Sequence, residues 1–116
     1  MLTLIGGERD NPEIDLRSVT IMKSVDVVVN GKTGIGVEIE LPKASLVLVH
    51  GDSGFVMCGY LDIQAADKKG DAAALVRGVC TVNDLLEADI AAVTKAAAKK
   101  GVKIGMTGRD ALSRLL

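Results

Sequence analysis

Residues 54–62, GFVMCGYLD, decide how the middle of the chain folds. A short continuous apolar run is typical of a buried strand, and this one ends at Cys58 and Gly59. Asp62 follows, and aspartate is a preferred residue type for capping the N-terminus of a helix. The stretch therefore predicts a strand-to-helix junction with a thiol at the strand end, a place where folds of sheets and helices often hold their sites.

Strands and a helix are predicted on both sides of this junction. Residues 46–49 form a second apolar run, joined to the first by a polar turn, so both runs are expected to be central strands. The helix capped by Asp62 is expected to end near Lys69, where Gly70 supplies a left-handed stop. Residues 73–80 alternate like a third strand, which places Arg77 within an apolar stretch.

The two ends of the chain have different patterns. Residues 19–41 alternate around an Asn-Gly pair at 30–31 and predict a β-hairpin with a tight turn. The hairpin carries more apolar surface than it can bury within itself, so another surface, such as a second subunit, is expected to cover it. The last third predicts three helices, with caps at Thr81, Asp89 and Thr107.

Length and composition indicate one globular domain. The chain has 116 residues, of which 48% are hydrophobic and 25% charged, as in a soluble domain with its own core. We predict an α+β fold: an N-terminal antiparallel β-hairpin region followed by a mixed sheet packed with three to four helices. Residues 1–18 are an N-terminal extension, 19–41 the hairpin and expected oligomerisation region, and 42–116 a β-β-α-β-α-α-α part.

Charge and cysteine usage exclude several classes of function. The net charge is −1 and no long basic run is present, so we expect no nucleic-acid partner. Cys58 and Cys80 belong to no Cys-x-x-Cys or Cys/His cluster, which predicts reduced thiols in a cytoplasm and neither a metal nor another cofactor. No apolar run reaches membrane-spanning length and the first residues lack a basic leader, so no membrane association is expected.

One tempting motif is set aside. Residues 51–54, Gly-Asp-Ser-Gly, match the surroundings of the nucleophile in chymotrypsin-like proteases. Such proteases need a separate histidine and a much longer two-barrel fold, whereas the only histidine here, His50, stands directly beside the motif. A turn between two strands explains these residues better.

Four residues are candidates for chemistry: Cys58, Asp62, Arg77 and Lys43. Cys58 could be a nucleophile, but no base or cation is near it in the sequence, and a buried strand cysteine is the favoured interpretation. Asp62 could be an acid or base group, and helix capping explains it most simply. Arg77 must reach a carboxylate, a ligand or an edge, with Asp62 or Glu38 as the expected ion-pair partner. Lys43 follows a strand end and is expected to be solvated.

Several short motifs, taken in order, resemble one known family. They are MCGYLD at 57–62 with the preceding LPKA at 41–44, then GV at 78–79 and TVNDLL at 81–86, and finally GMTGRDAL at 105–112. Together they resemble the YunC-like family, domain of unknown function 1805, over roughly residues 25–115. The resemblance implies an N-terminal β-sheet region that forms tetramers. It supplies no activity and no catalytic residue, and residues 1–18 depart from its pattern.

The leading functional hypothesis is a small, soluble, homo-oligomeric cytoplasmic protein without a known biochemical activity, with the hairpin in the subunit interface. An alternative is a small-molecule-binding protein or enzyme with a pocket near the junction at 57–62, on which the four candidate residues converge. A third is an accessory module that binds another protein. Whether the chain is an enzyme is left open.

Overall fold

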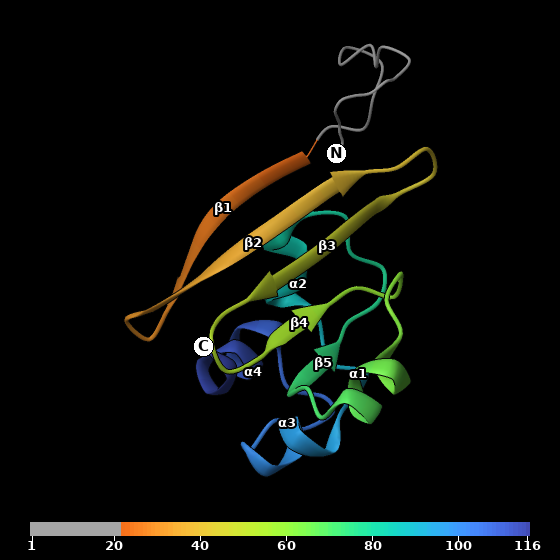
Figure 1. The fold of residues 1–116 in the computed structure, drawn as a ribbon. Helices are drawn as coiled ribbons and strands as arrows, with labels where there is room; N and C mark the ends of the chain where they lie inside the picture. Colours follow the sequence, from red (N-terminus) through yellow and green to blue (C-terminus); the bar gives the residue numbers. More distant parts are fainter. Residues whose placement is uncertain (1–21) are drawn as a thin grey trace, which may run out of the picture.

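The computed structural model describes residues 22–116, so the N-terminal extension and the first hairpin residues lie outside the described part. Figure 1 shows one mixed sheet with helices packed on it. Six strands follow one another across the sheet in chain order: β1 (Met22–Val29), β2 (Lys32–Glu40), β3 (Ser45–His50), β4 (Phe55–Met57), β5 (Ala73–Leu75) and β6 (Ala92–Val93). The described helices are α1 (Ile63–Lys69), α2 (Val82–Glu87), α3 (Lys95–Lys99) and α4 (Gly108–Leu115).

The sheet is antiparallel except at one place. β4 and β5 are parallel, while the neighbouring pairs β3–β4 and β5–β6 are antiparallel. Two parallel strands need a crossover between them, and α1 provides it. The predicted α+β fold with a mixed sheet and four helices is therefore confirmed for the described residues.

The N-terminal hairpin forms because its turn residues accept positive φ angles. Asn30 has a φ of 52° and Gly31 a φ of 76°, as a two-residue primed turn requires. The register then places Val29 opposite Lys32 and continues along the whole of β1. The hairpin predicted from the alternation and the Asn-Gly pair is confirmed from residue 22 onward.

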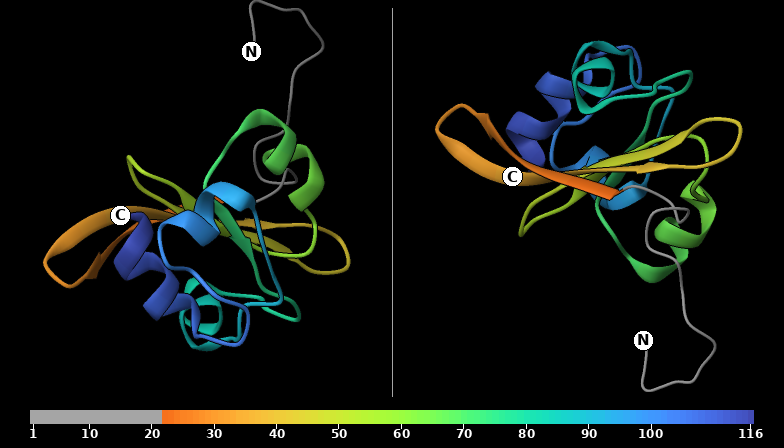
Figure 2. Two further views of the ribbon diagram at one scale, coloured as in Figure 1. Left: turned by 90° about the horizontal axis from the view of Figure 1, so that it is seen from below. Right: turned by 90° about the horizontal axis from the view of Figure 1, so that it is seen from above.

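Helices cover the two faces of the sheet unequally. Figure 2 shows α1 on one side of the sheet and both α2 and α4 on the other. The larger core lies under α2 and α4, where Val47, Val49 and Val56 pack with Leu85 and Leu112, all fully buried. The smaller core lies under α1. It contains Met57, Ala66, Ala73 and Leu75.

One face of the hairpin is partly covered by the chain itself. Val27 and Val29 are each only 6% exposed, because they belong to the larger core of the chain itself. Gly36 permits this close approach, since a Cβ there would lie 2.8 Å from Cγ2 of Val82 at the start of α2. The turn-proximal part of this face, Val27 and Val29, is thus buried within the subunit, while Val25 on the same face is 45% exposed.

The other face of the hairpin remains open within residues 22–116. Cross-strand partners share a face, and the register therefore groups Met22 with Ile39 and Asp26 with Ile35. We call the aliphatic side chains of this side the outer hairpin face: Met22, Val28, Ile35, Val37 and Ile39. Met22 is 68% exposed, Val28 61% and Ile35 44%, so apolar surface does remain uncovered on the hairpin.

Two predicted elements are corrected by the structure. The strand expected over residues 73–80 is regular only over Ala73–Leu75, and Arg77 lies in the loop beyond it. Asp89 does not cap a helix. The chain there is extended, because the Ile90 amide donates to the Met106 carbonyl at 2.7 Å and the Ala91 amide donates to the Leu75 carbonyl at 2.7 Å. Non-local pairing outweighs local helix propensity at this point, and the helix begins only after Thr94.

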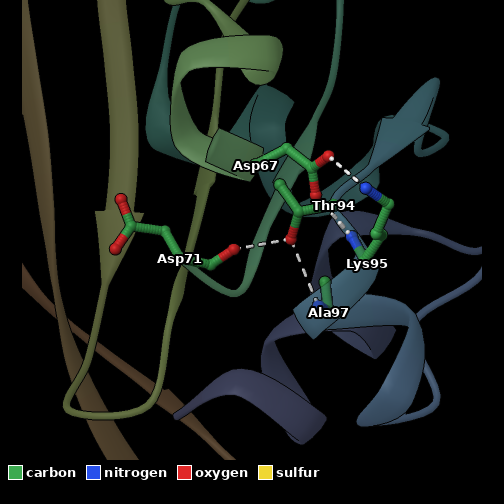
Figure 3. Close-up of polar contacts among 5 residues, drawn as sticks. All are labelled: Asp67, Asp71, Thr94, Lys95 and Ala97. Atoms are coloured by element: carbon green, nitrogen blue, oxygen red, sulfur yellow. Dashed lines mark hydrogen bonds and ion pairs between the residues drawn. The ribbon is translucent and has the colours of Figure 1, made fainter. Parts of the chain in front are cut away.

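Thr94 ties this extended segment to the start of β5 (Figure 3). The side chain is buried, and its hydroxyl accepts from the amides of Ala73 at 3.0 Å and Ala97 at 3.2 Å. The same hydroxyl donates to the Asp71 carbonyl at 2.6 Å. One buried hydroxyl thus caps α3 and positions the strand that lies beside β4.

Replacing Thr94 by valine is expected to destabilise the protein while preserving the side-chain shape. Thr94→Val leaves two amides and one carbonyl without their partner, which should lower the free energy of unfolding by about 1–3 kcal/mol. Chemical denaturation measures this change. Thr94→Ser keeps the hydroxyl and is the matched control. A valine variant as stable as the serine variant would show that the hydroxyl does not hold β5 in place.

Candidate ligand cleft at the ends of the parallel strands

The parallel pair brings two chain segments to the same edge of the sheet. Cys58 follows β4 directly, and Val76 follows β5. Backbone bonds extend the pairing past both strand ends: the Val76 amide donates to the Met57 carbonyl at 2.9 Å, and the Cys58 amide donates to the Val47 carbonyl at 3.0 Å. In open sheets with parallel strands, ligands commonly bind just beyond such carboxyl ends.

A cleft of about 340 Å³ opens at this edge. Three short segments line it: the end of the β2–β3 loop with the start of β3, the exit of β4, and the loop after β5. Their residues are Ala44, Ser45, Cys58, Gly59, Tyr60, Gly78, Val79 and Cys80. Its volume is at the lower end of the roughly 300–1,000 Å³ typical of ligand pockets.

Two glycines keep the backbone of the cleft accessible. Gly78 has a φ of 72°, which favours glycine, and a Cβ there would meet no atom within 4 Å. At Gly59 the nearest atom to such a Cβ would be Nη1 of Arg77, at 3.7 Å. Space therefore remains above both glycines, with the guanidinium of Arg77 close to one of them.

The two cysteines line the same cleft in different ways. Cys58 is buried, 3% exposed, and its sulfur accepts a hydrogen bond from the Val47 amide at 3.3 Å. Cys80 is exposed, and its backbone amide donates to Oδ2 of Asp84 at 3.1 Å. The buried position of Cys58 agrees with its interpretation as a strand cysteine, while Cys80 presents the accessible thiol.

Asp62 serves as the helix cap. Its Oδ1 accepts from the amides of Gln64 at 2.9 Å and Ala65 at 3.4 Å, and Gly70 ends α1 with a φ of 83°. This carboxylate therefore satisfies amides at the helix start that have no partner within the helix.

Arg77 does not form the ion pair that was expected for it. The ion pairs among residues 22–116 join Lys23 to Glu38, Lys95 to Asp67, and Arg109 to Glu87. Glu38 instead accepts from the Val82 amide at 2.7 Å and so fastens β2 to the start of α2. Arg77 is exposed in the loop after β5, with its guanidinium beside Gly59.

Of the four candidate residues, Cys58 lines the cleft and Arg77 borders it. Lys43 is exposed and precedes the lining residue Ala44, and Asp62 lies two residues beyond Tyr60. Sequence reasoning did not select Ser45, Tyr60 or Val79. Their signal is topological, because only the parallel pairing of β4 with β5 brings these segments together.

Other kinds of site find little support in the part of the chain that is described. Across residues 22–116, no three metal-ligating side chains are grouped closely enough to hold an ion. None of the helices there has the length and apolar character needed to cross a membrane.

Comparison with known proteins defines first a fold and then a family. The crystal structure of a protein of unknown function, TA1206 from Thermoplasma acidophilum, matches with a TM-score of 0.80 and 31% identity, covering 84% of this chain and 95% of that one. The uncharacterized protein YunC of Bacillus subtilis (strain 168) is 36% identical over 94 residues, 78% of this chain and 93% of YunC. The family model described as "Domain of unknown function (DUF1805)" matches residues 57–115.

The chain therefore belongs to the DUF1805 family, as its motifs indicated. The family match begins at Met57 and includes the β4 exit and the loop after β5. Its relatives are described as uncharacterised or of unknown function, so no activity is indicated by them.

The two thiols are expected to react at very different rates with a small alkylating reagent. Cys80 is exposed and should be modified quickly in the native protein. Cys58 is buried and hydrogen-bonded, and should be modified only when the structure opens. Mass spectrometry of peptides after timed exposure to iodoacetamide measures both rates. Equal rates in the native protein, or a faster Cys58, would contradict this arrangement.

Proposed function

We propose that the protein binds a small molecule in the cleft at the carboxyl ends of β4 and β5. One observation carries this proposal: the cleft lies beyond the ends of a parallel strand pair and is lined by small and apolar residues with a few hydroxyls and thiols. Ligand pockets usually combine apolar walls with a small number of polar groups. The two glycines leave backbone exposed to a ligand.

Binding is better supported than catalysis by a cysteine nucleophile. A cysteine nucleophile is commonly activated by an adjacent general base, and the one histidine of the chain, His50, pairs with Phe55 at the start of β4. Cys58 follows the other end of that strand. The imidazole is therefore remote from the thiol.

A screen of small organic probes tests the binding proposal. We expect amide chemical-shift changes at residues 44–45, 58–60 and 78–80 when a probe occupies the cleft. Gly59→Ala should weaken the binding of such probes, because the added methyl group would occupy space that the probe uses. The fold should tolerate it, since the nearest atom to this methyl group would be Nη1 of Arg77 at 3.7 Å. The control is Ala98→Gly, which also changes one methyl group, at an exposed site on α3 outside the cleft lining. Shifts that cluster elsewhere, or a Gly59→Ala variant that binds unchanged, would contradict the proposal.

We further propose that the protein is a homo-oligomer whose outer hairpin face lies in the subunit interface. The support is the exposure of three aliphatic side chains, Met22, Val28 and Ile35, on a sheet face that no helix of residues 22–116 covers. Contiguous exposed apolar surface commonly marks an interaction site. The homotetramer implied by the family resemblance is the form proposed here, with a cytoplasmic location supported by the two free cysteines.

Val28→Lys is expected to shift the assembly towards smaller species. A lysine in the middle of an apolar interface would have to be buried without a partner, whereas Val28 contributes little to the core of its own subunit. Light scattering after size-exclusion chromatography measures the mass.

Ile104→Lys is the matched control, because Ile104 is 67% exposed in a loop outside the hairpin. A wild-type monomer, or an assembly that Val28→Lys does not alter, would contradict the proposed interface. If the wild-type protein is a monomer whose outer hairpin face stays exposed, the result would instead favour an accessory module that binds another protein.

A further inference from the structure

The cleft lining carries no formal charge, and the guanidinium of Arg77 lies beside it. All eight lining residues are neutral types. Nη1 of Arg77 lies 3.7 Å from the position that a Cβ on Gly59 would occupy. Because Gly59 has no side chain, the guanidinium from the end of β5 can approach the exit of β4 directly. The rim of the cleft is therefore positively charged on this side.

Two carboxylates that are close in sequence to the lining residues accept backbone amides. Asp62 accepts the amides at the start of α1, and Asp84 accepts the Cys80 amide. Among residues 22–116, neither forms an ion pair with Arg77. Within residues 22–116 the guanidinium of Arg77 therefore has no carboxylate partner, and Lys43, the residue before Ala44, is exposed.

We infer that the ligand is a small organic carboxylate with an aliphatic body, and that Arg77 is the residue that selects its charge. This inference rests on the proposed binding function of the cleft. A guanidinium presents donors in a planar fork that matches the two oxygens of a carboxylate. One such fork beside neutral walls suits a singly charged carboxylate better than a phosphate dianion, which requires more donors.

The walls indicate the body of the ligand. Val79 and Cys58 supply buried apolar surface, and Ala44 adds a small side chain to the lining. Tyr60 is the sole aromatic residue of the lining and is 50% exposed. These side chains fit a short aliphatic chain rather than a flat ring that would need stacking partners.

Three probes of equal chain length test the inference on the full-length protein: hexanoate, 1-hexanol and hexylamine. Amide chemical shifts of Gly59 and Gly78 report binding in the cleft. We expect hexanoate to bind most tightly and hexylamine least. Arg77→Gln should weaken hexanoate about 10- to 100-fold, the loss expected for a hydrogen bond to a charged group, and should leave 1-hexanol nearly unchanged. Arg77→Lys keeps the positive charge without the planar fork, so its affinity for hexanoate should lie between those of the wild type and Arg77→Gln.

Arg109→Gln is the matched control, since it makes the same change at an exposed arginine of α4, which pairs with Glu87 of α2. It should bind hexanoate like the wild type. If hexanoate binds equally well to Arg77→Gln, or hexylamine binds as well as hexanoate, the carboxylate inference is wrong while the cleft remains a binding site. If none of the three probes shifts the amides of Gly59 and Gly78, the binding function itself is contradicted.

Discussion

The parallel pairing of β4 with β5 is the constraint on which the rest of the structure depends. It requires a crossover, and α1 supplies one within the short segment between the strands. It also places the chain after each strand at the same edge, where Cys58, Gly59, Gly78 and Val79 line one cleft. An antiparallel arrangement of the same strands would separate these segments by the length of the strands, and the cleft would not exist.

Three polar side chains, one of them the candidate Asp62, hold this arrangement together. Asp62 starts the crossover helix, Glu38 fastens the hairpin to α2, and Thr94 joins the start of β5 to α3. Each satisfies backbone amides, and an amide left without a partner costs more free energy than a typical hydrogen bond contributes. Arg77 differs from them, because it forms no ion pair with any carboxylate of residues 22–116.

The sheet separates two kinds of surface. The side under α2 and α4 holds the larger core, and Gly36 there admits Val82 close to the strands. On the other side, α1 covers β4 and β5 but not the hairpin, so the apolar side chains there remain exposed. The cleft lies at the end of the central strands, and the outer hairpin face lies on β1 and β2. Ligand binding and assembly can therefore use separate parts of one small domain.

Local signals determined much of this fold. The Asn-Gly turn, the caps at Asp62, Thr81 and Thr107, and the two apolar runs were readable because a turn or a cap depends on neighbours in the sequence. The sequence also selected Cys58 and Arg77, and it identified the junction beside the cleft.

Non-local contacts decided the remainder. The extended segment at Ile90 pairs with residues distant in the chain, so its alanine-rich pattern predicted a helix wrongly. The same holds for the covered face of the hairpin and for the separation of Arg77 from Glu38. Strand direction and helix placement depend on which distant backbone groups pair. Local patterns in a single sequence do not show which of these pairings is the most stable.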